Sequence, residues 1–150
     1  MYTREESSAI KQSFWTRFGQ YMQPVPSAGG DKVSWSNYKT GIRNIYFRLK
    51  AERSFAAVAI EITHSDPELR AQYFARFEQV RSMLHETLGE AWNWEENAIN
   101  SDGTPISSIS VQIKDVDVLK QADWPEIISF FKPRIILLDQ FWNEVKELFL

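Results

Sequence analysis

The chain has 150 residues, a length at which a single core can bury about 70% of the surface that the unfolded chain exposes. With 43% apolar and 25% charged residues, its composition excludes intrinsic disorder and predicts one globular domain over residues 1–150. It has no cysteine, which excludes disulfides and cysteine-based metal sites or nucleophiles. The charged N-terminus and the lack of a long uninterrupted apolar segment predict a cytoplasmic protein without a membrane partner.

The first third of the chain predicts a helix followed by a β-hairpin. Thr3 and Glu6 have the spacing of a capping box, and apolar residues recur behind them at helical intervals, so a helix is expected over residues 4–22. Prolines and glycines then form a loop. Apolar and polar residues alternate at 33–35 and again at 45–49, which predicts two half-buried strands joined by a turn.

The central part of the chain predicts a buried strand and a long helix. In residues 55–63, apolar residues occupy both the odd and the even positions, so both faces of a strand here would be apolar. This is typical of a central strand covered on both faces. Asp66 is suited to cap the following helix, and a stripe of apolar residues continues at helical spacing as far as Gly89. We therefore expect one helix between these two residues.

A second hairpin and a final helix complete the predicted fold. Alternating residues at 92–94 and 108–113 flank a turn signal at 100–103. Asp123 and Glu126 repeat the capping-box spacing before an apolar helix that a proline kinks or divides. The order is α-β-β-β-α-β-β-α, which predicts an α+β fold with a mixed or antiparallel sheet and flanking helices.

Several short motifs are distributed along nearly the whole chain. They include Phe18-Gly19-Gln20-Tyr21-Met22, Trp35-Ser36-Asn37-Tyr38-Lys39-Thr40-Gly41, Ile60-Glu61-Ile62-Thr63-His64, Trp92-Asn93-Trp94, Phe130-Phe131-Lys132-Pro133-Arg134 and Asp139-Gln140-Phe141-Trp142. Together they resemble a bacterial family known as domain of unknown function 4268. Its members occur alone or joined to nuclease-like modules of restriction systems, so the resemblance implies a nucleic-acid context but no defined activity.

The predicted order is also similar to that of restriction-endonuclease-like cores, which begin α-β-β-β-α-β. Those enzymes hold Mg²⁺ with an acid on one strand and a Glu-x-Lys motif on the next. Glu61 lies at the place of that glutamate, but Thr63 replaces the lysine, and the preceding strand carries Arg43 and Arg48 instead of a carboxylate. One hypothesis is a divergent or inactive metal-dependent nuclease-like domain using Glu61. The other is that Glu61 is a partly buried acid paired with an arginine or with other donors.

Glu61, His64 and Asp66 are the candidates for a metal site, because all three lie near the end of one predicted strand. However, the Asp66 side chain is expected to cap the following helix, and the chain has only two histidines. Phosphate-loop and serine-nucleophile motifs are absent from the sequence. We therefore expect no metal, no cofactor and no catalytic residue other than the candidate Glu61.

The charge distribution identifies a candidate binding surface. Between residues 32 and 53, six basic residues stand against the single acid Glu52, which gives this segment +5 in a chain whose net charge is −3. Cations interleaved with aromatic rings can neutralise phosphates and stack on bases. The candidate nucleic-acid-binding residues are Lys39, Arg43, Tyr46, Arg48 and Lys50. The alternative is a solvated face whose cations pair with acids of the same chain.

The last helix is richer in apolar residues than one buried face requires. Either a homodimer forms through this C-terminal helix, or the first helix covers the second face within one chain. We predict a bacterial binding module without enzymatic activity, associated with nucleic acid through the basic hairpin. A nuclease-like domain using Glu61 and a homo-oligomeric structural protein are the alternatives.

Overall fold

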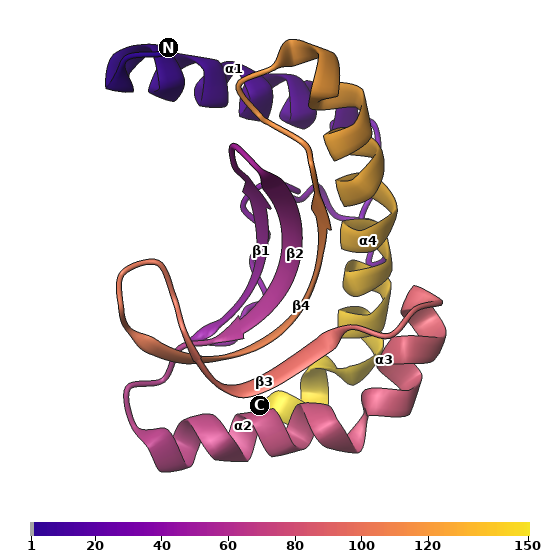
Figure 1. The fold of residues 1–150 in the computed structure, drawn as a ribbon. Coiled ribbons are helices and arrows are strands. Elements are labelled where there is room, and N and C mark those ends of the chain that lie inside the picture. The colour runs from indigo at the N-terminus through magenta and orange to yellow at the C-terminus, as the bar shows by residue number, and fades with distance from the viewer. Residues whose placement is uncertain (1) are drawn as a thin grey trace.

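The structure, a computed structural model, describes residues 2–150 and contains one sheet with helices around it (Figure 1). Its helices are α1 (Arg4–Met22), α2 (Pro67–Gln79), α3 (Arg81–Leu88) and α4 (Trp124–Val145), with short 3₁₀ helices at Gln121–Asp123 and Lys146–Phe149. Its strands are β1 (Ile45–Ala51), β2 (Phe55–Ile62), β3 (Asn93–Ile99) and β4 (Pro105–Lys114). The predicted α+β class is confirmed.

The sheet is antiparallel throughout and has the strand order β1-β2-β4-β3, so two hairpins are joined through the central pair β2 and β4. It is strongly curved. Helix α4 runs along its convex side, while α1 and α2 lie across its two ends (Figure 1). The concave side faces away from α4, and none of the described helices lies on it. The sheet therefore has one face in the core and one open face.

The first helix begins and ends where the sequence predicts. The Thr3 hydroxyl accepts a hydrogen bond of 3.0 Å from the Glu6 amide, and the Thr3 amide donates one of 3.1 Å to the Glu6 carboxylate. The buried rings of Phe14 and Phe18 lie 6.2 and 5.7 Å from the ring of Phe131 in α4. These edge-on aromatic contacts hold α1 against the first half of α4.

Strand alternation decides which residues of β1 enter the core. Ile45 and Phe47 are buried, whereas Tyr46 and Arg48 between and after them are exposed. The ring of Phe47 meets Trp142 of α4 edge-on, with 5.5 Å between centroids. The convex side of β1 thus packs on α4, and the opposite side carries the polar residues.

Residues 33–35 do not form the strand predicted for them, because residues 23–44 are an irregular loop. Trp35 is buried even so. Its indole donates a hydrogen bond of 3.1 Å to the Val25 carbonyl, and its ring stacks on Tyr38. The alternation of apolar and polar residues in this segment therefore comes from side chains that each pack on the core separately, and not from strand pairing. Without this strand the α-β-β-β-α-β order is lost, and the similarity to restriction-endonuclease-like cores is not confirmed.

Two details of the predicted helices are wrong. The helix that follows Asp66 is divided at Val80, whose φ of −110° and ψ of 18° depart from helical geometry. Asp123 does not cap the last helix with its side chain, which instead accepts a hydrogen bond of 2.9 Å from the Asp117 amide. Pro133 lies inside α4 without dividing it. Local spacing therefore predicts where these helices lie and the cap at Asp66, but not the break at Val80 or the actual partner of Asp123.

Most apolar residues of α4 are buried by packing within the chain. Ile127, Phe131, Ile135 and Leu138 are fully buried beneath the sheet, α1 and α3, whereas Leu148, beyond the end of the helix, stays 59% exposed. Packing within the chain, by α3 as well as by the first helix that the sequence predicts, accounts for this composition. None of the helices described is long and apolar enough to cross a membrane.

Candidate binding surface

The concave face of the sheet carries alternate side chains from all four strands. Strand pairing sets Tyr46 opposite Glu61, Glu61 opposite Ser108, and Ser108 opposite Glu95, so these four residues form one row across the sheet. The next row consists of Arg48, Ala59, Ser110 and Asn93, and the row after it of Lys50, Ala57 and Gln112. The pairing confirms that Tyr46, Arg48 and Lys50 share one face of β1.

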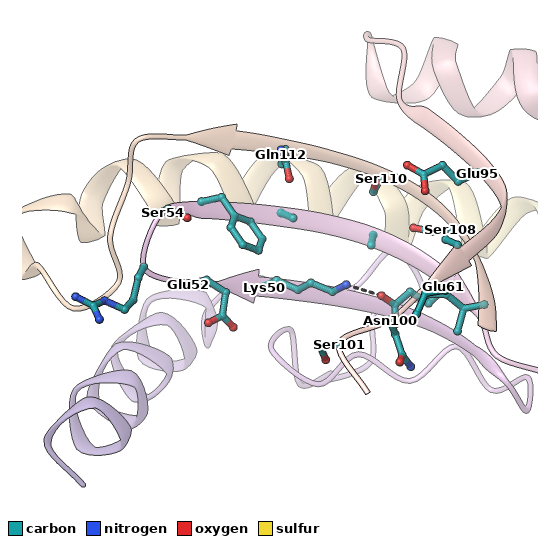
Figure 2. Close-up of a pocket in the computed structure, with 17 residues that line it drawn as sticks. Lys50, Glu52, Ser54, Glu61, Glu95, Asn100, Ser101, Ser108, Ser110 and Gln112 are labelled. Carbon is teal, nitrogen blue, oxygen red and sulfur yellow. Dashed lines mark hydrogen bonds and ion pairs between the residues drawn. The ribbon is translucent and has the colours of Figure 1, made fainter. Parts of the chain in front are cut away.

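A hollow of about 780 Å³ lies on the concave face between the β1–β2 turn and the β3–β4 turn (Figure 2). Its floor consists of small residues on the two central strands, namely Ala57, Ala59, Ser108 and Ser110. Longer side chains form its rim, among them Lys50, Glu52, Arg53, Glu95 and Asn100. The curvature of the sheet already makes this surface concave. Small residues at its centre and larger ones at its edges make the hollow deeper.

Glu61 lies in this hollow with both carboxylate oxygens bound. Arg48 donates from Nε to Oε1 at 3.0 Å. Lys50 donates from Nζ to Oε2 at 2.6 Å (Figure 2). The Glu61 side chain is 4% exposed, whereas those of Arg48 and Lys50 remain 45% and 39% exposed. Two cations therefore stabilise one carboxylate that would be costly to bury alone. Lys50 stands opposite Ala57 and reaches Glu61 four residues further along β2.

Arg48 has donor groups left after it binds Glu61. Its guanidinium carbon lies 4.2 Å from the centroid of the Tyr46 ring, within the range of a cation–π contact. Its two terminal nitrogens make no hydrogen bond with any of residues 2–150. Tyr46 itself is 38% exposed. The edge of the sheet thus presents a stacked arginine and tyrosine whose outer groups face solvent.

Lys39 and Arg43 lie in the loop before β1, beside a second hollow of about 350 Å³ that residues 37–46 line. Both side chains are exposed, and neither forms an ion pair within the described chain. Tyr46 lines this hollow and also belongs to the concave face. We call Lys39, Arg43, Tyr46, Arg48 and Lys50 the basic surface, because Tyr46 joins its two parts.

The opposite edge of the concave face is acidic. Glu95 of β3 is exposed, and its Oε1 accepts a hydrogen bond of 2.7 Å from the side chain of Asn93. No cation pairs with it in the part of the chain that the structure describes. Glu52, at the β1–β2 turn, is paired with Lys11 of α1 at 2.7 Å. Cations along β1 therefore face an unneutralised carboxylate on β3 across an uncharged floor.

The three metal candidates do not come together. Both oxygens of Glu61 are engaged by cations. Asp66 caps α2 by accepting a hydrogen bond of 2.9 Å from the Glu68 amide, and His64 stacks on Tyr73 with 4.5 Å between ring centroids. Among residues 2–150, no three histidine, aspartate or glutamate side chains are grouped so that they could hold a metal ion.

Sequence reasoning missed the floor of the hollow and its acidic rim. Ser108 and Ser110 alternate with apolar residues and therefore predict a strand, but alternation alone indicates no role for the face that they share. The pairing of β3 with β4 shifts by one residue between Glu95 and Ala98, so that Ala98 faces the hollow together with Glu95. A β-bulge of this kind reverses the faces of a strand and is not visible in simple alternation.

No curated protein and no solved structure matches the chain. The family model described as "Domain of unknown function (DUF4268)" matches residues 10–146, a span that includes the whole basic surface and all four strands. On the strength of this match over most of its length, the chain belongs to the DUF4268 family.

Proposed function

We propose that the chain is a single non-catalytic binding domain and that it binds nucleic acid on the basic surface. The observation that carries this proposal is that Tyr46, Arg48 and Lys50 project side by side from β1 onto a face that no described helix covers. Cations next to an exposed aromatic ring are suited to neutralising phosphates and stacking on a base. The nucleic-acid context implied by the family resemblance agrees with this chemistry.

The local charge supports the proposal. Lys39, Arg43, Arg48 and Lys50 contribute four positive charges, and Glu61 is the one carboxylate bound among them, so the surface stays positive in a chain whose net charge is −3. Both paired cations keep donors that Glu61 does not bind, namely the terminal nitrogens of Arg48 and the other N–H groups of Lys50. Because the rest of the chain is acidic, we expect binding of moderate affinity that weakens as salt is added.

Fluorescence anisotropy with labelled oligonucleotides at low salt tests the proposal. The informative variant replaces Arg43, Arg48 and Lys50 with glutamine. Each phosphate contact to a single strand contributes about 0.7 to the slope of log K against log salt, so this variant should lose up to roughly 2 units of slope together with most of its affinity.

The matched control removes the same charge elsewhere. Arg4, Arg81 and Lys120 are exposed and lie outside the basic surface, so replacing all three with glutamine should leave most of the binding intact. The proposal is wrong if the parent protein does not bind, or if both triple variants lose affinity to the same extent. In the second case net charge alone, and not this surface, determines binding.

Two other functions have weaker support. A metal-dependent nuclease centred on Glu61 needs carboxylate oxygens that are free to bind Mg²⁺, and both are engaged by cations. Mg²⁺-dependent cleavage of nucleic acid that disappears in Glu61→Gln would support the nuclease hypothesis. Self-association through α4 needs an exposed apolar face, and the apolar residues of this helix are mostly buried within the chain. Sedimentation measurements that show a concentration-dependent dimer would support self-association.

A further inference from the structure

Charge is divided across the concave face. Arg48 and Lys50 lie on β1 at one edge, and Glu95 lies on β3 at the other. Glu61, between them, is buried and neutralised by the two cations, so it adds no free negative charge to the middle of the face. A ligand that matches this face must be negative along one edge and must donate hydrogen bonds along the other.

The space between the two edges is concave and lined by small residues. The row from Tyr46 to Glu95 crosses four neighbouring strands, which places its ends about 14 Å apart at roughly 4.8 Å per strand. Ser108 and Ser110 form the floor beside two alanines, and neither hydroxyl makes a hydrogen bond with another of the described residues. The hollow of about 780 Å³ over this floor is open to solvent, and Figure 2 shows both serines and Glu95 facing it.

A nucleotide strand has the required polarity. Its phosphates are negative, its bases are flat, and the edges of the bases that pair in a duplex carry hydrogen-bond donors. In a duplex those edges are occupied and the second backbone brings phosphates to the far side, where Glu95 would repel them. An unpaired strand can instead place its phosphates near β1 and its bases over the floor.

We infer, on the basis of the proposed function, that the concave face binds a single strand with its phosphates at Arg48 and Lys50 and its bases directed toward β4 and β3. At the far edge Glu95 meets the pairing edge of a base. Guanine offers a carboxylate two adjacent N–H donors, whereas adenine, cytosine and thymine each place an acceptor beside their donor. Glu95 therefore selects guanine at the position that reaches it.

The test measures affinity and base preference separately. Labelled single strands of equal length carry guanine, adenine, cytosine or thymine throughout a central block, and a duplex of the same length is included. The parent should bind the single strands more tightly than the duplex and should prefer guanine by about fivefold, the low end for a bidentate contact because Glu95 is exposed to water.

Two variants and one control assign the roles. Glu95→Gln should abolish the guanine preference without lowering the salt slope, because glutamine keeps the size of the side chain and loses one acceptor. Lys50→Gln should weaken all strands alike and lower the slope by about 0.7 while the preference remains. Glu96→Gln is the matched control, because Glu96 is the adjacent exposed carboxylate and does not line the hollow. Its base preference should equal that of the parent.

The outcomes separate this inference from the proposed function. If single strands bind but Glu95→Gln keeps the parent's preference, or if the duplex binds as tightly as the strands, the orientation is wrong and nucleic-acid binding by the basic surface stands. If no oligonucleotide binds, the proposed function fails and the inference fails with it. Thermal unfolding of each variant confirms that it is folded at the assay temperature.

Discussion

The hydroxyl of Tyr38 donates a hydrogen bond of 2.5 Å to Oδ1 of Asp139, joining the loop before β1 to the middle of α4 across 101 residues of sequence. Asp139 is 5% exposed, and its other oxygen accepts a hydrogen bond of 2.6 Å from the Ala28 amide. Burial, together with the hydrogen bond to Asp139 and its charge, raises the pKa of Tyr38 far above its usual value, so the phenol stays a donor. This contact anchors the loop that carries Lys39 and Arg43.

Tyr38→Phe tests the strength of this anchor. The substitution keeps the ring that stacks on Trp35 and Phe47 but leaves a buried carboxylate with one donor fewer. Hydrogen bonds to charged groups contribute about 1.5–3 kcal/mol, which corresponds to a fall in Tm of roughly 3–10 °C for a chain of this length. Calorimetry measures the change. Tyr21→Phe, at a tyrosine that is 52% exposed, serves as the control and should alter Tm by less than about 2 °C.

The sequence predicted those parts of the fold whose signals are local. The capping box at Thr3 and the aspartate cap at Asp66 each satisfy backbone amides within three residues, so spacing alone identified them. The strand expected at 33–35 failed because the burial of Trp35 depends on partners elsewhere in the loop. The break at Val80 was invisible for a different reason, since the apolar stripe continues across it without a glycine or proline.

The candidate site, too, was predictable from the sequence only where its signals are local. Alternation in β1 was enough to place Tyr46, Arg48 and Lys50 on one face. Their relation to Glu61 was not predictable in detail, because it depends on the register between β1 and β2 and on a curvature that lets Lys50 reach four residues along the next strand. Glu95 continues the alternation of Asn93 and Trp94, but its place at the edge opposite β1 depends on the strand order β1-β2-β4-β3, which local alternation does not give.

Glu61→Gln should destabilise the protein by about 1–2 kcal/mol. Removing one member of a fully buried ion pair costs about 3–5 kcal/mol, but Arg48 and Lys50 are partly exposed and can turn toward water, so the effect is smaller. Urea denaturation provides the measurement. Glu95→Gln changes the same charge on the same face at an exposed position and should stay within about 0.5 kcal/mol of the parent. Equal effects of both variants would mean that Glu61 is not held by its two cations.

Arg134→Lys should weaken the link between α4 and the segment before β3. Arg134 grips the Glu90 carboxylate with two hydrogen bonds, of 2.9 Å from Nε and 3.0 Å from one terminal nitrogen. Burial by itself would raise the pKa of Glu90, but the hydrogen bonds from Arg134 and Trp92 and the charge of Arg134 lower it overall. Lysine keeps the charge but cannot form the fork.

We expect Arg134→Lys to cost about 1–2 kcal/mol in the free energy of unfolding, measured in urea. Lowering the pH should reproduce part of this loss in the parent. The pKa of Glu90 is depressed in the folded state, so its contribution is present above the usual value near 4.5 and is lost as the pH falls below it. A variant as stable as the parent at pH 7 would show that the two-point geometry contributes nothing beyond the charge.

Acid should destabilise the protein in part through His64. This side chain is buried against Tyr73, and its Nδ1 has no hydrogen-bond partner among the described residues. Burial first, and then the positive charge of Arg70, lower the pKa of His64 below its usual value near 6.5, while Asp66 opposes them. The folded state therefore favours neutral histidine, and the unfolded chain takes up the proton first. Stability from this group is present above pH 6.5 and is lost as the pH falls below that value.

His64→Phe keeps an aromatic ring for Tyr73 and removes the titration. Between pH 7.5 and pH 5.5 the parent should lose up to about 1.4 kcal/mol more than this variant, because one group can contribute no more than that per pH unit below its unfolded pKa. Thermal unfolding at the two pH values measures the difference, expected to be roughly 2–5 °C in Tm. His64→Leu also loses the stacking, so it should be less stable at both pH values yet share the flatter pH dependence. If both variants keep the acid sensitivity of the parent, other groups cause it and the imidazole does not titrate on unfolding.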